Sequence, residues 1–464
     1  MKAAPAPDAL AAAAEREAWC AARAAEAVES ARAAGAEQAE AVVESGRGFT
    51  VRVSGGEIES LEQSATRGLG LRVLVRGATG FVSSNDLGPE ALADLARRAV
   101  ALARFSSPDP ANGLPRREDL EAAAADDDLA LVDPELAQLG AAAKIEMALA
   151  LERAALGFDP RVKKVEGAQV GSREGSVALA NSEGLARVSS ATSMSAWVQP
   201  LAEDAGGKQQ SGSHYVARRR LAGFPEPEEV AAEAARRALA RIGARPVPTA
   251  RVPVIMHPDV AQSWLDDMYE AFTAEAVIKR ESWLTGRLDQ VIAAPLVTLV
   301  DDGRLRGGIG TSLWDGEGVP TRRNVLIERG RLAMVEYDCY WARRGGVRST
   351  GNAVRAGSIG YHNLFVEPGS ESPEAILARV ERGFYMDDQG SYGFNPVTGD
   401  YSFQAQGFWI EHGEKAFPVE GVTVAGRSLD MLRGIEAVGN DLRLESSVGC
   451  PTLLITGMTV GGSG

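Results

Sequence analysis

Histidine is the residue that most often holds a catalytic metal, and this chain contains few histidines. Zinc hydrolases place two of them one helical turn apart, with a glutamate between them as general base. The histidines here are widely separated along the chain, at His214, His257, His362 and His412. The sequence therefore excludes a zinc motif carried on one helix. A site assembled from distant residues stays open, and capping, packing or surface positions are the ordinary alternatives.

A pair of carboxylates is the next candidate for chemistry. The spacing of apolar residues predicts a helix from Pro258 to about Glu275, on which Asp266 and Glu270 are four residues apart and share one face, with Asp267 beside them. Such a pair can hold a hard cation or act as acid and base. It is also typical of a solvated helix face, and both interpretations stay open.

Cysteine offers a third route to catalysis. Cys450 has no histidine near it in sequence and would need a tertiary neighbour to become a nucleophile; otherwise it is a small residue of the core. With Cys20 and Cys339 it makes an odd, dispersed set, which is typical of a reducing compartment and not of a disulfide framework. Neither a Gly-x-Ser-x-Gly elbow nor a P-loop is present.

Charge and hydropathy exclude two classes of partner. The net charge of −14, with arginines scattered among acidic residues, disfavours binding to a nucleic acid. No apolar run approaches the roughly 18 residues that a membrane span needs, so we expect no membrane contact. The N-terminal residues do not have the apolar segment and cleavage site of a secretion signal, and we therefore expect a cytoplasmic protein.

A chain of 464 residues is long enough for two or three domains. Prolines at positions 246 and 248 follow a predicted helix, and the pattern changes beyond them, so we place a boundary between domains 1–247 and 248–464. In the first domain, the spacing predicts helices packed on antiparallel strands, joined in part by an exposed connection at 106–133. The helices are predicted at 8–34, 89–104, 134–156 and 226–242, the strands at 49–53, 68–75 and within 162–216, and the turns at 77–80, 173–175, 181–184 and 205–207.

The second domain is predicted to be mostly β. A buried strand at 252–256 precedes the helix that begins at Pro258, and one further helix is expected near 373–383. The remaining strands are short and should pair largely antiparallel, so the fold class is α+β.

Strings rich in glycine, asparagine and aspartate predict hairpins in this second domain, with turns that need positive φ. They lie at 301–303, 314–323, 349–352, 363–369, 393–402, 407–411 and 417–426. Taken in this order, they resemble the TldD/PmbA family, chains once called modulators of DNA gyrase and grouped with metallopeptidases. Residues 56–60 and 67–73 extend the resemblance to the first domain, so that it spans nearly the whole chain.

The resemblance implies different chemistry for the two branches of that family. In the TldD branch a helix carries His-Glu-x-x-x-His, and a later loop adds a cysteine that completes a zinc site. The matching helix here has Leu265, Asp266 and Glu270, without histidine, and the loop near 437–440 has no cysteine. The ending at 439–451 instead resembles the PmbA (TldE) branch, whose members pair with a TldD chain and do not ligate the metal.

The expected function is therefore that of a non-catalytic subunit in a TldD/TldE-type zinc metallopeptidase complex that encloses and cleaves unfolded or short peptides. This chain would hold no cofactor, and the partner would hold the zinc. Two alternatives stay open: a homodimeric peptide-binding or regulatory protein, and a self-sufficient hydrolase that uses a carboxylate or Cys450. For contact with peptide we select polar residues of the glycine-rich loops, although each could instead serve only to form its turn; they are Asp315, Glu317, Asn352, Asn395 and Asp400.

Overall fold

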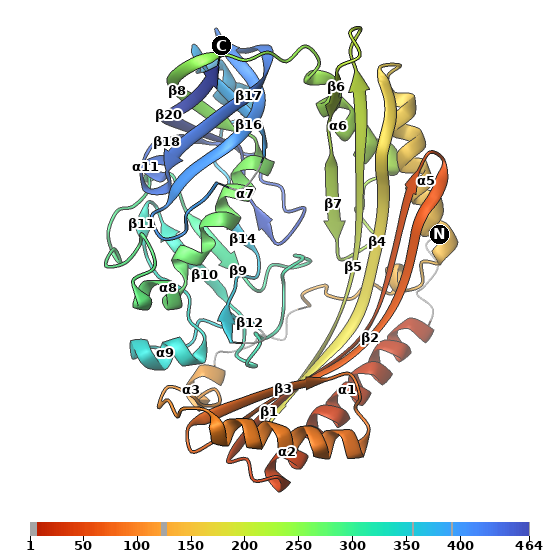
Figure 1. The fold of residues 1–464 in the computed structure, drawn as a ribbon, viewed down its shortest axis with the longest axis vertical. Helices are drawn as coiled ribbons and strands as arrows, with labels where there is room; N and C mark the ends of the chain where they lie inside the picture. Colours follow the sequence, from red (N-terminus) through yellow and green to blue (C-terminus); the bar gives the residue numbers. More distant parts are fainter. Residues whose placement is uncertain (1–6, 122–127, 355–356, 391–392, 464) are drawn as a thin grey trace.

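The computed structural model describes residues 7–121, 128–354, 357–390 and 393–463. Figure 1 shows a long, curved sheet with helices on its outer side, facing a second body of shorter strands that contains the C-terminus. The fold is of the mixed α+β class that the sequence predicts, with an N-terminal helix packed on an antiparallel sheet and β-rich sheets in the C-terminal half.

The N-terminal half alternates groups of strands with helices. Its elements are α1 (Pro7–Ala33), β1 (Gln38–Ser54), β2 (Glu57–Val75), β3 (Ala78–Ser84), α2 (Pro89–Phe105), α3 (Arg117–Leu120), α4 (Pro134–Ala137), α5 (Ala141–Phe158), β4 (Val162–Asn181), β5 (Ala186–Glu203), β6 (Gln209–Ser211), β7 (His214–Arg218) and α6 (Pro227–Ala240). The strands pair antiparallel in the order β3-β2-β1-β4-β5-β6, and β7 also pairs with β5.

The central strands are longer than the sequence predicts. Residues 173–175, predicted as a turn, continue inside β4, where Arg173 lies opposite Gly48 of β1 and Ser193 of β5. The error has a physical reason. A Cβ at Gly46 would lie 2.9 Å from the carbonyl oxygen of Glu174, so only very small residues fit where β1 and β4 pair at this point. In the sequence, such small residues resemble those of a turn.

Two pairs of helices cover the outer side of the sheet. Figure 1 shows α1 and α2 at one end and α5 and α6 at the other, each pair over its own apolar cluster. Two glycines permit close contact: a Cβ at Gly80 would lie 2.1 Å from the carbonyl oxygen of Ala99 in α2, and one at Gly212 would lie 2.3 Å from the amide of Ala238 in α6. The helix predicted at 134–156 is divided into α4 and α5, because Gly140 adopts an extended conformation as the N-cap of α5.

The C-terminal half consists of short elements around one large core. They are β8 (Pro248–Met256), α7 (Pro258–Met268), the 3₁₀ helix η1 (Tyr269–Phe272), α8 (Ala274–Lys279), β9 (Leu299–Asp302), β10 (Arg323–Glu328), β11 (Arg331–Leu332), α9 (Cys339–Gly345), β12 (Ala353–Val354), β13 (Ser358–Ile359), β14 (Leu364–Val366), α10 (Pro373–Ala378), β15 (Arg382–Gln389), β16 (Asp400–Glu411), β17 (Glu414–Arg427), α11 (Ser428–Arg433), β18 (Ile435–Val438), β19 (Val448–Gly449) and β20 (Leu453–Ser463).

The main sheet of this half closes on itself. Its order is β17-β16-β15-β8-β20-β18, and an additional pairing of β17 with β20 joins the two sides into a ring. A second sheet has the order β11-β10-β9-β14-β19, and β12 pairs with β13. Most pairings are antiparallel, as predicted, but β8 runs parallel to β15 and β14 parallel to β19.

Three further local predictions for the chain are wrong. The helix expected from Pro258 to about Glu275 is divided into α7, η1 and α8, because the side chain of Thr273 caps a new helix at the amide of Ala276. The short helices α9 and α11 were not predicted. The stretch 106–133 is not simply exposed: Leu114 and Asp119 are buried, and Asp119 accepts a hydrogen bond from the amide of Ser349 at 3.0 Å. Residues 122–127 of that stretch lie outside the described residues.

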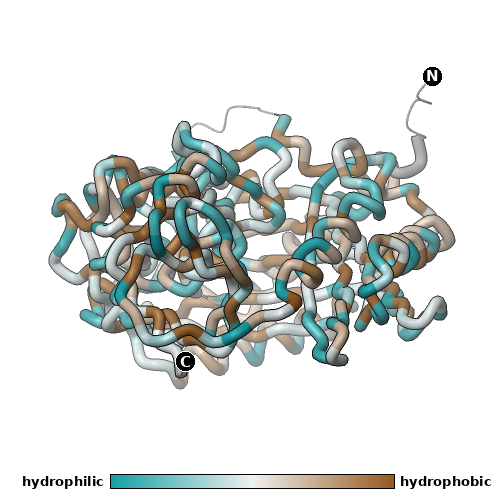
Figure 2. The backbone as a smooth tube through the Cα atoms, turned by 90° about the horizontal axis from the view of Figure 1, so that it is seen from above, coloured by the Kyte–Doolittle hydropathy of each residue, from teal (hydrophilic) through white to brown (hydrophobic). Residues whose placement is uncertain are grey.

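Hydrophobic and hydrophilic residues alternate over short distances along the backbone (Figure 2). Among the described residues, no helix combines the length and the apolar character that crossing a membrane requires.

Candidate functional site

The helix α7 carries the residues for which the family resemblance predicts a degenerate metal site. His257 caps the helix by accepting the amide hydrogen of Asp259 at 3.2 Å, and Leu265 is buried in the core. Asp266 and Glu270 are exposed, but the helix ends at Met268, so they are not on one continuous α-helical face. The predicted carboxylate pair is therefore divided between α7 and η1.

Asp266 is held by a residue from a distant loop. Its carboxylate accepts a hydrogen bond of 2.7 Å from the hydroxyl of Tyr361, whose ring lies edge-on to Tyr269 with 4.8 Å between centroids. The C-terminal loop also reaches α7, because Gln262 donates to the hydroxyl of Ser446 at 3.2 Å. The exposed end of α7 is thus tied to loops near 361 and 446.

Asp267 faces the hairpin formed by β15 and β16. Gln389 donates to its carboxylate at 3.5 Å and accepts a hydrogen bond of 2.8 Å from the hydroxyl of Tyr401. Burial and, to a smaller extent, the neighbouring charge of Asp266 raise the pKa of Asp267 to about 6. This carboxyl group can therefore take up a proton slightly below neutral pH.

A buried polar network supports the end of α7 from behind, and sequence reasoning missed it as a unit. Asp301, Glu336 and Asn352 are each fully buried. Asn352 donates to Asp301 at 2.8 Å and accepts from Asn324 at 2.8 Å, while the hydroxyl of Tyr269 donates to Glu336 at 2.5 Å. In the sequence, Asp301 belongs to a segment that predicts a turn. Glu336 is an acidic residue in an apolar stretch and carries no further signal.

The two acidic residues of this network share a proton. Asp301 and Glu336 are hydrogen-bonded to each other, and burial raises the pKa of both carboxyl groups. The charge of Asp301 raises the pKa of Glu336 further. The charge of His362 opposes the rise at Asp301, but burial outweighs it, so the buried, hydrogen-bonded pair favours a state with one proton between the two carboxyl groups.

Three of the five loop residues selected for peptide contact are buried. Asp315 accepts hydrogen bonds from the amides of Glu317, Val319 and Ala353 at 2.9 to 3.0 Å, which is the turn-forming alternative weighed for it. Glu317 accepts from the amide of Cys339 at 2.8 Å. Asn352 belongs to the network behind α7. In this conformation these side chains hold their loops in shape.

The other two, Asn395 and Asp400, are exposed beside the turn between β15 and β16. Asn395 accepts from the amides of Val397 and Thr398, and Asp400 lies 3.2 Å from Arg427 and accepts from the hydroxyl of Thr398. The structure thus separates the five residues into a buried set and an exposed pair. Their role in substrate binding stays a prediction.

The residues at α7 do not fit zinc. Leu265 has no donor atom, and within the described ranges no group of three or more His, Cys, Asp or Glu side chains could hold a metal ion. The alternative that relies on Cys450 also lacks support, because its thiol is 1% exposed and burial raises its pKa far above the usual range. A buried neutral thiol is a poor nucleophile.

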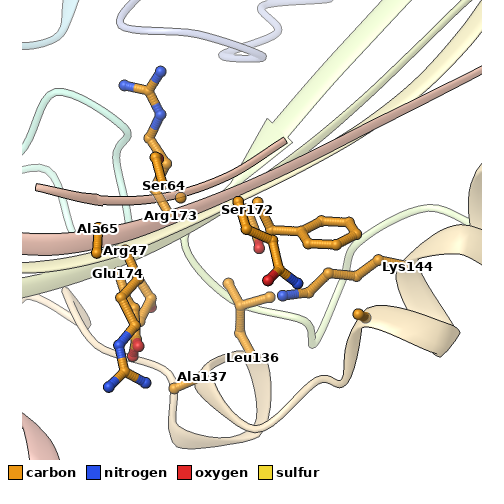
Figure 3. A pocket seen from close by; sticks show the side chains of 14 residues that line it. Arg47, Ser64, Ala65, Leu136, Ala137, Lys144, Ser172, Arg173 and Glu174 are labelled. Carbon is orange, nitrogen blue, oxygen red and sulfur yellow. The ribbon is translucent and has the colours of Figure 1, made fainter. Parts of the chain in front are cut away.

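A pocket on the outer side of the long sheet was not predicted from the sequence. It has a volume of about 540 Å³ and lies between the strands and the segment that carries Leu136 and Lys144 (Figure 3). The ammonium of Lys144 lies 5.2 Å from the centroid of the Phe49 ring, and burial lowers the pKa of this lysine. Figure 3 shows Arg47 and Arg173 pointing to opposite sides of the sheet.

Comparison with known proteins identifies the class to which this fold and site belong. Three family models match the chain: PmbA/TldA metallopeptidase domain 1 at residues 39–103, the central domain at 134–242 and the C-terminal domain at 249–462. The metalloprotease PmbA of Escherichia coli O157:H7 is 33% identical, with 91% of this chain and 92% of the relative covered. A PmbA homolog of Haemophilus influenzae is 31% identical, with 92% of each covered. The chain belongs to the PmbA/TldD metallopeptidase family.

Solved structures share the fold. A protein of Bacteroides thetaiotaomicron described as a candidate modulator of DNA gyrase superposes with a TM-score of 0.88 at 26% identity, covering 95% of this chain and 98% of the other. TldE of Thermococcus kodakarensis superposes with a TM-score of 0.81 at 23% identity, covering 95% and 100%. The expected family resemblance is confirmed over nearly the whole chain.

Proposed function

We propose that this chain is the non-catalytic subunit of a zinc metallopeptidase complex of the TldD/TldE type, which acts in the cytoplasm on unfolded or short peptides. The observation that supports this proposal is the end of α7. Leu265 is packed in the core, and Asp266 is held by the hydroxyl of Tyr361, at positions where the family's catalytic chains carry His-Glu-x-x-x-His. In this proposal the zinc and the general base belong to the partner.

The contribution of this chain would be enclosure and peptide contact. An enclosed chamber admits extended peptides and excludes folded domains, because a folded domain cannot bring its backbone to the metal. Asn395 and Asp400 are exposed and can meet a peptide directly. Asp315, Glu317 and Asn352 would act through the loops that they hold. We also propose that the chain divides into domains 1–247 and 248–464, with a sheet on each side of the boundary.

Reconstitution tests this proposal. The purified chain, a TldD-type chain from the same organism and their mixture would be incubated with an unfolded polypeptide, with and without a chelator. We expect hydrolysis only when the TldD-type chain is present, and loss of hydrolysis with the chelator. A chelator-sensitive hydrolysis by this chain alone would overturn the proposal.

Variants at α7 separate an enclosing role from a catalytic one. In the mixture, Asp266→Ala and Glu270→Ala should leave the rate within about twofold, whereas a His→Ala change in the partner's motif should abolish hydrolysis because it removes a metal ligand. Ser263→Ala, on the exposed side of the same helix, is the matched control. A hundredfold loss in Asp266→Ala but not in Ser263→Ala would place catalysis in this chain.

A further inference from the structure

A second pocket lies where the two halves of the chain meet and is lined by residues of β3 and α9. Its volume is about 570 Å³. The sheet contributes Glu40, Arg72 and Phe81, and the C-terminal half contributes residues of the loop at 316–317 and of α9 with the residue before it. Arg72 and Glu317 belong to the sequence segments 67–73 and 314–323, but neither segment alone indicates a pocket.

The floor of this pocket has more acidic groups than basic ones. The guanidinium of Arg72 lies 3.2 Å from Glu40 and 3.6 Å from Glu317, so it is shared between two carboxylates. Asp338 adds a third carboxyl group beside them, capping α9 at the amide of Trp341. Among the described residues that line the pocket, Arg72 is the one that carries a positive charge.

This arrangement leaves two buried atoms without a hydrogen bond among the described residues, the Oε2 atom of Glu40 and the Nη2 atom of Arg72, but the Arg72 atom lies within ion-pair distance of two carboxylates. The side chain of Glu40 is 6% exposed. Burial raises the pKa of Glu40 to about 7 even though Arg72 opposes the shift, and burial together with the charge of Glu317 raises the pKa of Asp338 to about 7. A buried carboxylate without a full partner is costly, and a second cation would relieve that cost.

The mouth of the pocket is different, because its charges are already paired. Asp109 accepts from the hydroxyl of Tyr340 at 2.9 Å and lies 3.6 Å from Arg344, and Glu275 lies 2.6 Å from Lys279. The walls there are aromatic: Tyr340 and Trp341 lie edge to face with centroids 5.1 Å apart, and Phe81 is 53% exposed. Arg344 lies 5.3 Å from the centroid of the Tyr340 ring, and Arg344 and Lys279 each lie 5.6 Å from that of Trp341, so these rings already have cations of this chain beside them. The aromatic surface that remains can pack against an apolar stem.

We propose that this pocket binds an organic cation, an ammonium or guanidinium group on an apolar stem, with the Oε2 atom of Glu40 as its partner on the floor and the aromatic residues around the stem. The site goes beyond the proposed function and does not depend on it. Two kinds of ligand have such a group: a free amine, and the basic side chain of a peptide. An anion is disfavoured, because Arg72 is already shared by two carboxylates.

Calorimetric titration of the full chain tests the proposal. The probes are pentylamine and agmatine as cations, with pentanol and pentanoate as neutral and anionic analogues. We expect the two cations to bind and the analogues to bind at least tenfold more weakly. Tighter binding of pentanoate would show an anion site at Arg72, and absence of binding by both cations would equally overturn the proposal.

Variants locate the binding. Glu40→Gln keeps the shape of the side chain and should weaken pentylamine binding at least tenfold, whereas Glu62→Gln removes the same charge from an exposed position on β2 and should change nothing. If Glu40→Gln does not fold, Phe81→Ala serves instead, because this side chain is exposed and should be dispensable for folding. Unchanged binding in a folded Glu40→Gln or Phe81→Ala protein would contradict the proposed geometry.

A further titration with peptides distinguishes a free amine from the basic side chain of a peptide as the ligand. A short unfolded peptide with one lysine is compared with the same peptide carrying norleucine at that position. If the lysine peptide binds at least tenfold more tightly and pentylamine displaces it, the pocket recognises a basic side chain. If pentylamine binds and neither peptide does, the pocket takes a free amine.

Discussion

At the scale of single residues, the protonation of Asp301 and Glu336, in the network behind α7, makes the stability of the fold depend on pH. The pKa of both carboxyl groups is raised in the folded chain, so the folded state binds more protons than the unfolded state at pH values above about 4. The free energy of unfolding therefore falls as pH rises from about 4 through the raised values. The cost arises because an ionised carboxylate replaces a protonated one in a buried site.

Glu336→Gln should reduce this dependence on pH. The amide cannot ionise, it can still accept the hydroxyl hydrogen of Tyr269, and its NH₂ group can donate to Asp301. Urea unfolding at several pH values between 4 and 8 should show a smaller fall in the free energy of unfolding for this variant than for the wild type. Glu328→Gln, at an exposed position of β10, is the control and should follow the wild type. Parallel curves for wild type and Glu336→Gln would contradict a shared proton.

The site residues show what sequence can and cannot supply at this scale. The absence of a histidine pair and the place of Leu265 and Asp266 on a helix follow from residue types and spacing alone. The burial of Asp315 and Asn352 does not, because a polar residue in a glycine-rich string looks the same on a surface turn and inside a network. Their partners, such as Asp301 and Ala353, become neighbours only after folding.

At the scale of elements, the close contact between β3 and α2 depends on Gly80. A methyl group there would meet the backbone of α2, with its Cβ 2.1 Å from the carbonyl oxygen of Ala99. We predict that Gly80→Ala lowers the free energy of unfolding by about 1–3 kcal/mol, because the helix must move away from the strand. Denaturant unfolding monitored by circular dichroism measures this change.

Gly157→Ala is the matched control, and its effect should have the opposite sign. Gly157 lies in the last turn of α5, where an added Cβ would have no described atom within 4 Å. Alanine has a higher helix propensity than glycine, so the variant should be more stable by about 0.5–1 kcal/mol. Equal effects of the two substitutions would show that the contact between β3 and α2 is looser than described.

Helices were predicted more accurately than strands for a physical reason. The sequence predicts α1, α2 and α6 with nearly their observed bounds, because apolar spacing and proline at the first turn mark a helix locally. The strands β1 and β4 are much longer than predicted, since their middle parts carry glycine, serine and charged residues that pair with other strands. The length of such a strand depends on its pairing with neighbouring strands of the sheet, and a single sequence does not show which strands pair.

At the scale of the whole molecule, the buried Arg241 and the half-buried Arg219 join the two halves. Arg241, after α6, lies 3.0 Å from both Asp387 and Asp388 at the end of β15, and donates to the carbonyl oxygen of Ser211. Burial raises the pKa of Asp387, but the charges of Arg241, His257 and Arg237 and the hydrogen bond from Arg241 together outweigh it and hold the pKa below its usual value. Arg219 makes a similar connection through the carbonyl groups of residues 308, 309 and 311, and burial lowers its pKa to about 10.

Arg241→Ala should be strongly destabilising, because it leaves the carboxylate of Asp387 buried without its cation. We predict a loss of about 3–5 kcal/mol in the free energy of unfolding, measured in denaturant at neutral pH. Arg236→Ala, which removes an exposed ion pair with Glu233 on α6, should cost less than about 1 kcal/mol. A loss of the same small size for both variants would mean that the junction does not rely on this ion pair.

The fold class could be predicted because helical spacing in the first half and short alternating strands in the second half are local signals of an α+β fold. The closed ring of strands could not, since it depends on the pairing of β17 with β20, which are separated by α11, β18 and β19 in the sequence. The pocket at Glu40 was missed for the same reason: its residues come from both halves of the chain.

Purification of a tagged form of this chain from its own organism, at native expression, tests the central claim most directly. We predict that it brings down, in equal amount, a second chain that carries His-Glu-x-x-x-His. The recovered complex should contain zinc and should cleave an unfolded peptide until a chelator removes the metal. Recovery of this chain alone, as a homodimer without a second chain, would contradict the account.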